Sequence, residues 1–176
     1  CLKYLIDQKN ESIKGIILIS PMCGIDDHLK PSPLVTKILI LSSKIIPTWK
    51  LVTTTKKMSN ENVINKDYIH AKQLCSYNYK GSLRLSTARE LYLNSLWISN
   101  NAQNIDIPIL VFHGLNDKIT TPIATKTVFE RMKSKDKELI LLPQSEHSLL
   151  IPNNNDDLTP NFIIAKIVVW LNNHLC

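Results

Sequence analysis

Two side chains in this sequence have the chemical type and the spacing to move a proton together. Asp117 closes the segment FHGLND at residues 112–117, and His147 lies 30 residues later in the segment SEHS at residues 145–148. An imidazole titrates near neutral pH and is a usable general base there. A carboxylate that accepts the imidazole Nδ1–H fixes its tautomer and stabilises the imidazolium. The pair therefore predicts acid–base catalysis, for which a nucleophile is still needed.

Each of these residues follows a predicted buried strand. Residues 107–114 and 138–143 are short apolar runs rich in branched side chains, as in strands covered on both faces. Between them, Thr121 can serve as N-cap of a helix with Pro122 in its first turn and an apolar stripe of Val128, Phe129 and Met132. Strand, helix and strand at this spacing predict a right-handed βαβ unit. The carboxyl ends of neighbouring parallel strands meet at one sheet edge, so we expect Asp117 and His147 to lie close together.

The rest of the chain divides into a core and an insertion. A short helix over 3–8 and a third buried strand over 13–21 precede the insertion, and a helix over 161–173 closes the chain with a broad apolar stripe expected to pack on the sheet. Residues 24–104 lack strong strand signals and contain helix candidates at 34–46, 67–77 and 87–99, with a polar loop at 50–65. The sequence thus predicts an α/β fold, with a core of 1–23 and 105–176 and a helical cap at 24–104.

Composition excludes several classes of site. The chain has 176 residues, the length of one domain, and only four widely separated glycines: Gly15, Gly24, Gly81 and Gly114. They cannot form a Walker A loop, a G-x-G-x-x-G dinucleotide loop or a G-x-S-x-G nucleophile elbow. The four cysteines and five histidines show neither CxxC nor zinc spacing. We therefore expect no metal, no cofactor and reduced thiols, as is usual for an intracellular protein.

The net charge of +6 could indicate an anionic partner. The lysines are scattered, however, and aromatic residues make up only 6% of the chain and do not alternate with the basic ones. A solvated lysine-rich surface, without a nucleic-acid partner, is the simpler interpretation. The apolar run at 34–46 is interrupted by polar residues and is too short to span a membrane.

Four segments together resemble the α/β-hydrolase family, and most closely its monoacylglycerol lipase and lysophospholipase branch. They are IILISP at 16–21, GSLRLSTARE at 81–90, IPILVFHGLND at 107–117 and SEHS at 145–148, and they occur in the family's order. The resemblance implies that Asp117 is the acid and His147 the base of a Ser-Asp-His triad. It also implies a lipid ester substrate, a lysophospholipid or a monoacylglycerol.

The family's nucleophile elbow would lie upstream of Cys1, at the start of the helix whose tail is 2–8. Ser20 cannot replace it, because Ser20 ends the next strand without elbow glycines. We therefore expect a C-terminal portion of the fold, inactive alone, whose strand at 13–20 has an unpaired edge. The cap would cover the carboxyl edge of the sheet. Core packing is the commoner use of its apolar side chains, although they could also line an acyl groove or contact a membrane.

Two other functions stay open on sequence grounds. The chain could be a non-catalytic α/β-hydrolase relative that acts as a binding or interaction module. It could also be a basic protein that binds lipids or nucleic acids, although no motif in the sequence indicates this function. A G-x-S-x-G motif upstream would favour the enzyme, and strongly salt-dependent binding to polyanions would favour the basic binding protein.

Overall fold

Three parallel strands form the sheet in a computed structural model that describes residues 1–8, 12–25, 30–50, 66–77, 81–154 and 156–175. The strands are β1 (Ile16–Ile19), β2 (Ile109–Gly114) and β3 (Lys137–Leu142), in the order β1-β2-β3. Leu18 pairs with Val111, and Gly114 pairs with Leu142. All three strands are shorter than or shifted from their predicted ranges by one to three residues, but their type and parallel direction are confirmed. Within the described chain, β1 forms an edge of the sheet, as expected.

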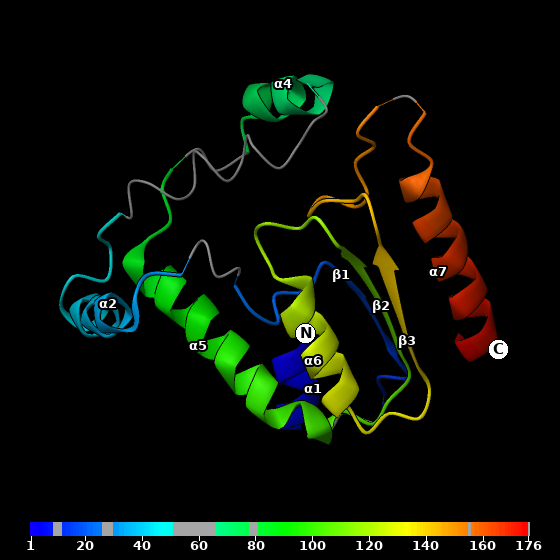
Figure 1. Cartoon of the computed structure of the whole chain (residues 1–176), viewed down its shortest axis with the longest axis horizontal. Helices are drawn as coiled ribbons and strands as arrows, with labels where there is room; N and C mark the ends of the chain where they lie inside the picture. Colours follow the sequence, from blue (N-terminus) through cyan, green and yellow to red (C-terminus); the bar gives the residue numbers. More distant parts are fainter. Residues whose placement is uncertain (9–11, 26–29, 51–65, 78–80, 155, 176) are drawn as a thin grey trace.

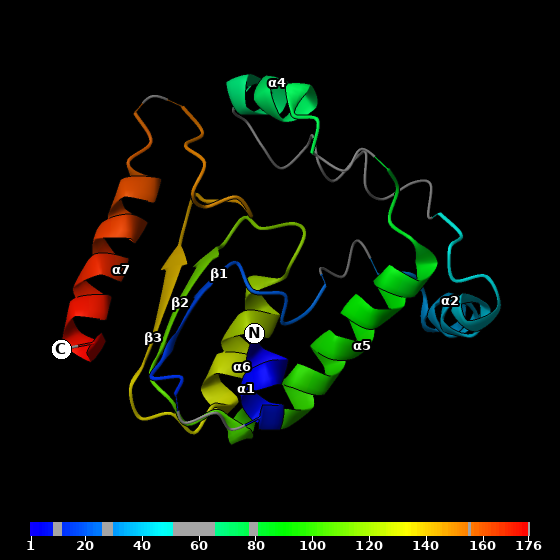
Figure 2. The same ribbon diagram turned by 180° about the vertical axis from the view of Figure 1, so that it is seen from behind.

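Helices cover both faces of this sheet. On one face lie α1 (Leu2–Gln8), α5 (Leu85–Asn101) and α6 (Pro122–Arg131), and a 3₁₀ turn (Ala102–Asn104) continues α5 toward β2. On the other face lies α7 (Thr159–Leu175), and Figures 1 and 2 show the sheet between the two layers from opposite sides. This is the predicted α/β architecture.

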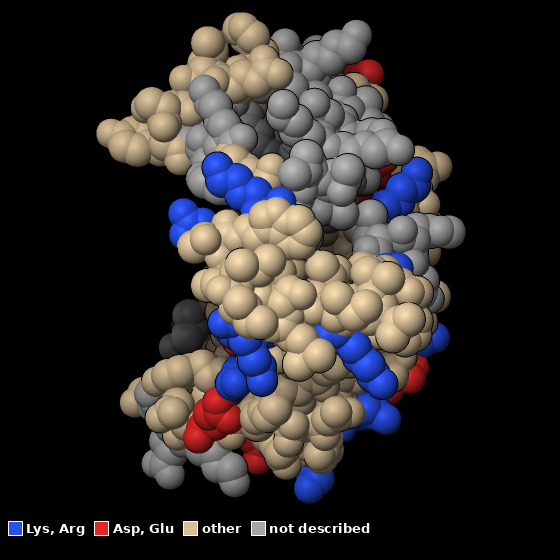
Figure 3. Space-filling view, turned by 90° about the vertical axis from the view of Figure 1, so that its left-hand side faces the viewer, with Lys and Arg blue, Asp and Glu red and all other residues tan. Residues whose placement is uncertain are grey.

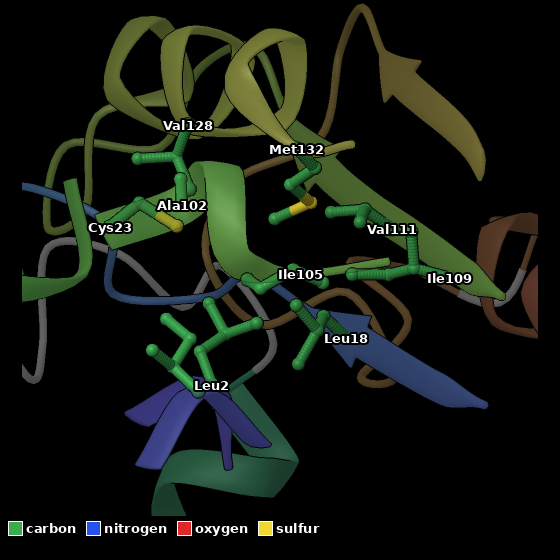
Figure 4. Packing of buried hydrophobic residues seen from close by; sticks show 10 residues of the cluster. Leu2, Leu18, Cys23, Ala102, Ile105, Ile109, Val111, Val128 and Met132 are labelled. Atoms are coloured by element: carbon green, nitrogen blue, oxygen red, sulfur yellow. The ribbon is translucent and has the colours of Figure 1, made fainter. Parts of the chain in front are cut away.

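Alternation along β2 divides the core between the two faces. Successive strand side chains point to opposite faces, so Ile109 and Val111 join one cluster, and Leu110 and Phe112 join the other. The first cluster also takes Leu2, Leu18, Val128 and Met132, which converge from α1, β1 and the α6 region in Figure 4. The second cluster is closed by Ile163 and Trp170 of α7. Every residue of β2 is buried, and β2 is the central strand of the sheet, so both core clusters pack against it.

The insertion contains α2 (Pro33–Ile45) and α4 (Lys66–Leu74), followed by α5. These helices confirm the three predicted ones, whereas the predicted polar loop lies almost entirely outside the described residues. The expectation that the apolar residues of α2 are mainly buried is wrong. Ser43 is the buried residue of α2, and its Oγ accepts a hydrogen bond from Arg89 of α5. Among the described elements, α2 packs mainly against α5 and buries only the stripe that faces it, so Leu34, Ile38, Leu41 and Ile45 remain exposed.

The helices α6 and α7 form where the sequence predicts them, but the cap of α6 and the burial of α7 differ in detail from the prediction. Thr121 does occupy the N-cap of α6, but its side chain makes no capping hydrogen bond, and Met132 packs into the core just beyond the helix end.

In α7 the apolar stripe is only partly buried. Ile163 and Trp170 face the sheet, whereas Phe162, Ile164 and Val168 are about half exposed because they lie around the helix from the packed face. None of the described helices has the length and hydropathy needed to cross a membrane.

The packing of the first core cluster can be tested through its thiol. Burial raises the pKa of Cys23 to about 11, although a hydrogen bond with Thr125 opposes the rise. The reactive thiolate is therefore scarce at pH 8. We expect iodoacetamide to label exposed Cys75 at least about tenfold faster than Cys23 in the native chain, measured by peptide mass spectrometry. Denaturation in urea should remove the difference, and equal native rates would contradict this packing.

Candidate catalytic site

Asp117 lies in the turn that follows β2, and its carboxylate is fully buried. Oδ1 accepts hydrogen bonds from the main-chain N–H groups of Ile119 and Thr120, at 2.8 and 3.0 Å. Such bonds to the backbone two and three residues ahead are typical of an aspartate that starts a turn. Oδ2 accepts the Thr120 hydroxyl at 2.8 Å. The sequence after β2 therefore folds locally around its own carboxylate.

His147 lies in the loop after β3 and brings its ring to the same carboxylate. Its Nδ1 is 2.7 Å from Asp117 Oδ2, and its side chain is 31% exposed. The structure thus brings together the two residues that the sequence singled out. With the Nδ1–H donated to an ionised carboxylate, Nε2 is the ring nitrogen left to accept a proton. This is the arrangement of a general base held in one tautomer by a carboxylate.

A second histidine also contacts the carboxylate, and the sequence analysis assigned it no role. His113 is fully buried in β2, and its Nε2 lies 3.1 Å from Asp117 Oδ2 and 3.1 Å from the Thr120 carbonyl oxygen. Both neighbours are acceptors, so Nε2 carries the proton, whereas Nδ1 has no hydrogen-bond partner among the described atoms. The spacing of four residues before Asp117, at the end of a buried strand, was the signal that could have revealed it.

The pKa of Asp117 reflects the balance between burial and hydrogen bonding. Burial by itself raises the pKa of a carboxyl group, because it penalises the charged form. Here the hydrogen bonds from His113, His147, Ile119 and Thr120 outweigh burial and hold the pKa of Asp117 well below its usual range. The carboxylate is therefore ionised throughout the pH range in which an imidazole acts as a base.

Main-chain contacts join the loop that carries the base to the loop that carries the acid. The Leu115 N–H donates to the Leu142 carbonyl oxygen at 2.9 Å, and the Asn116 N–H donates to the Ser145 carbonyl oxygen at 3.0 Å. At Gly114 the approach is so close that an added Cβ would overlap the carbonyl oxygens of Ser145 and Glu146. Glycine is thus required at the end of β2 for His147 to reach Asp117.

Ser20 lies near this pair but is not presented to the imidazole. Its hydroxyl donates to the main-chain carbonyl oxygen of His147 at 2.7 Å. This contact agrees with the expectation that Ser20 is not the nucleophile. Among the described residues, no cluster of three or more His, Cys, Asp or Glu side chains could hold a metal ion.

Comparison with known proteins gives the site a family context. A family model described as serine aminopeptidase, S33, matches residues 1–154. A caffeoylshikimate esterase of Arabidopsis thaliana is 25% identical over 163 residues, which cover 92% of this chain and 48% of that protein. A monoglyceride lipase of Saccharomyces cerevisiae is 24% identical over 191 residues, covering 99% of this chain and 57% of that protein. The chain thus spans about half the length of these relatives.

Two solved structures share the fold. A soluble variant of the Saccharomyces cerevisiae monoglyceride lipase, crystallised with a substrate analog, superposes with a TM-score of 0.80 and 21% identity over 99% of this chain and 61% of that chain. The monoacylglycerol lipase of Paleococcus ferrophilus gives a TM-score of 0.79 and 19% identity over 98% and 63%. At these identities, the likeness establishes the fold.

The hydrogen bonds on Asp117 make a prediction about stability and pH. We expect Asp117→Asn to lower the free energy of unfolding at pH 7 by about 2–3 kcal/mol, because hydrogen bonds to a charged group are lost. The folded-state pKa of Asp117 lies below its ordinary value of 3.8. The contribution of the carboxylate is therefore fully present above about pH 4 and is lost as the pH falls below that.

Urea unfolding of both proteins at pH 7, 5 and 3 measures this difference. Asp156→Asn, in the loop before α7, is the matched control, since Asp156 is exposed and should give little change at any pH. A difference between wild type and Asp117→Asn that stayed constant down to pH 3 would contradict the assigned hydrogen bonds.

Proposed function

This chain belongs to the serine aminopeptidase S33 family, within the α/β-hydrolases, and we propose that it supplies the acid and the base of a Ser-Asp-His triad that cleaves carboxylic esters of glycerolipids. The observation that carries the proposal is the 2.7 Å contact between His147 Nδ1 and the buried, ionised Asp117. Relatives that are named as an esterase and as monoglyceride lipases support ester hydrolysis as the reaction.

The proposed reaction needs a serine that is not among these 176 residues, since the chain contains no G-x-S-x-G motif. His147 Nε2 takes the proton of that serine as its oxygen attacks the ester carbonyl carbon. The imidazolium then passes this proton to the departing alcohol oxygen, which leaves an acyl-serine. Water attacks the acyl carbon, again losing a proton to Nε2, and the proton returns to the serine oxygen. Asp117 remains ionised throughout and holds the ring in place.

We base the proposed substrate class on the insertion at 24–104, which we propose is a cap over the carboxyl edge of the sheet. Burying an acyl chain against apolar side chains contributes about 25 cal/mol for each Å² removed from water. A monoacylglycerol or a lysophospholipid offers such a chain beside a hydrolysable ester. Because the named lipases act on monoglycerides, a monoacylglycerol is the first substrate to test.

We also propose that α2 contacts a lipid surface. Leu34, Ile38, Leu41 and Ile45 recur every three or four residues and are 52–84% exposed, so they form one apolar stripe on the outside of the helix. Lys37 and Lys44 lie along one side of this stripe and are also exposed. Figure 3 shows the face on which α2 lies, with a broad uncharged surface bordered by lysine and arginine side chains. An apolar stripe with flanking cations is suited to an anionic membrane surface.

The triad proposal is tested on the gene product that contains these residues together with any that precede them. A fluorophosphonate probe should label one serine, and a medium-chain monoacylglycerol should be hydrolysed. His147→Gln should reduce both the labelling rate and kcat at least about a thousandfold, since it removes the general base. The 176-residue chain alone should give no turnover of a nitrophenyl ester that depends on His147.

The matched control is another His–Asp pair, His174 with Asp136. His174 of α7 lies 2.8 Å from Asp136, which precedes β3 and so lies at the opposite end of that strand from His147. His174→Gln should therefore leave labelling and kcat unchanged. A gene product without a probe-reactive serine would overturn the enzyme proposal in favour of the binding module. Turnover by the isolated chain that His147→Ala abolished would overturn the claim that the nucleophile lies outside it.

The membrane proposal is tested by vesicle flotation. We expect the chain to float with vesicles that contain about 30% phosphatidylserine, and the double variant Leu41→Ser/Ile45→Ser to lose at least about tenfold in partitioning, because two exposed apolar side chains are removed. Ile123→Ser on α6 is the matched control, since Ile123 is 76% exposed but lies outside the α2 stripe. Equal losses in both variants would contradict a specific role of α2.

A further inference from the structure

Ser20 has a backbone conformation that serine rarely adopts. It follows β1 directly, and its φ of 45° makes it the single non-glycine residue with positive φ in the described chain. Left-handed backbone costs an L-residue energy and persists where the surrounding structure holds it. Its N–H still donates to the Phe112 carbonyl oxygen at 2.9 Å, so the ladder with β2 is kept up to this residue. The chain therefore turns sharply at Ser20 while remaining attached to the central strand.

The turn directs the Ser20 side chain toward the loop that carries the base. Ser20 is 8% exposed, and its hydroxyl donates to the His147 carbonyl oxygen at 2.7 Å across 127 residues of sequence. That oxygen also accepts the Leu149 N–H at 3.1 Å. Leu149 belongs to the same loop as His147, so its bond shapes the loop internally. The Ser20 bond, in contrast, fixes the loop against the sheet.

We propose that Ser20 is a positioning residue for His147, an inference that rests on the proposed role of His147 as the base. The N–H groups of Leu115 and Asn116, which follow β2, hold the residues that precede His147 in its loop. Ser20, at the end of β1, holds the main chain of His147 itself. With its main chain fixed by β1 and its Nδ1 fixed by Asp117, the imidazole has one orientation. The function of the hydroxyl is thus to set the direction of Nε2, without touching the substrate.

Two substitutions separate the hydroxyl from the backbone strain. Ser20→Ala removes Oγ and keeps the Cβ, so the left-handed backbone costs as much as before. Ser20→Gly removes Oγ and also relieves the strain. If only the backbone turn mattered, Ser20→Ala would hold the His147 ring as firmly as wild type does, and Ser20→Gly would hold it at least as firmly. If the hydroxyl positions His147, both variants hold the His147 ring less firmly than wild type does.

How firmly the His147 ring is held is measured by NMR on the 176-residue chain with ¹⁵N-labelled histidine. We expect exchange of the His147 Nδ1 proton with solvent to be about fivefold faster in both Ser20→Ala and Ser20→Gly, the size of effect for one neutral hydrogen bond. The matched control is Ser134→Ala. Ser134 is also buried, and its hydroxyl donates to the carbonyl oxygen of Asp136, away from the site. Exchange of the β2 amides should stay unchanged in all variants, which excludes a general loss of stability.

Each outcome decides the matter. Faster exchange confined to the His147 ring in both Ser20 variants supports the inference, and a fivefold lower kcat at unchanged KM in the hydrolytically active gene product supports it further. Wild-type exchange in either Ser20 variant overturns it and leaves the proposed triad intact. If the wild-type chain shows no protected His147 Nδ1 proton, the pair with Asp117 is not formed, and both proposals fail.

Discussion

The buried carboxylate of Asp117 is the group on which the rest of the site depends. A buried carboxylate needs hydrogen-bond donors around it, because without them burial would favour its protonated, neutral form. Asp117 meets this demand with donors from three places: two main-chain N–H groups and a hydroxyl of its own turn, His113 of β2, and His147 of the loop after β3. The charge that orients the His147 ring is therefore also the charge that holds two loops and a strand together.

The parallel sheet makes this convergence possible. β2 is buried along its whole length and lies between β1 and β3, so segments from all three strands end at the same edge. β2 leads to Asp117, β3 leads to His147, and β1 ends directly before Ser20, whose hydroxyl donates to the main-chain carbonyl oxygen of His147. Gly114 is the steric condition for this arrangement, because any side chain there would push away the loop that follows β3.

The insertion is held differently from the site. Both faces of β2 are covered by apolar clusters, whereas α2 is supported by α5 and directs its apolar stripe outward. The proposed catalytic pair would gain from a fixed orientation, since small changes in orientation reduce proton transfer. A segment that meets a lipid surface instead needs apolar groups that are not already buried in its own core. The proposed functions of the two regions fit this difference, because Asp117 fixes the His147 ring by a hydrogen bond whereas α2 leaves apolar side chains exposed.

The sequence by itself determined the α/β class, the three strands, the order of the helices and the close approach of Asp117 and His147. These follow from local signals: buried strands read as apolar runs, and parallel strands must deliver their carboxyl ends to one edge. The exposure of Leu41 and Ile45 did not follow, because an apolar helix reads the same whether it faces a core or solvent. Nor did His113 or Ser20, whose importance lies in contacts with residues far away in the chain or in a backbone angle. Only the tertiary structure decided these, because hydrogen-bond partners and burial depend on which surfaces the packed elements bring together.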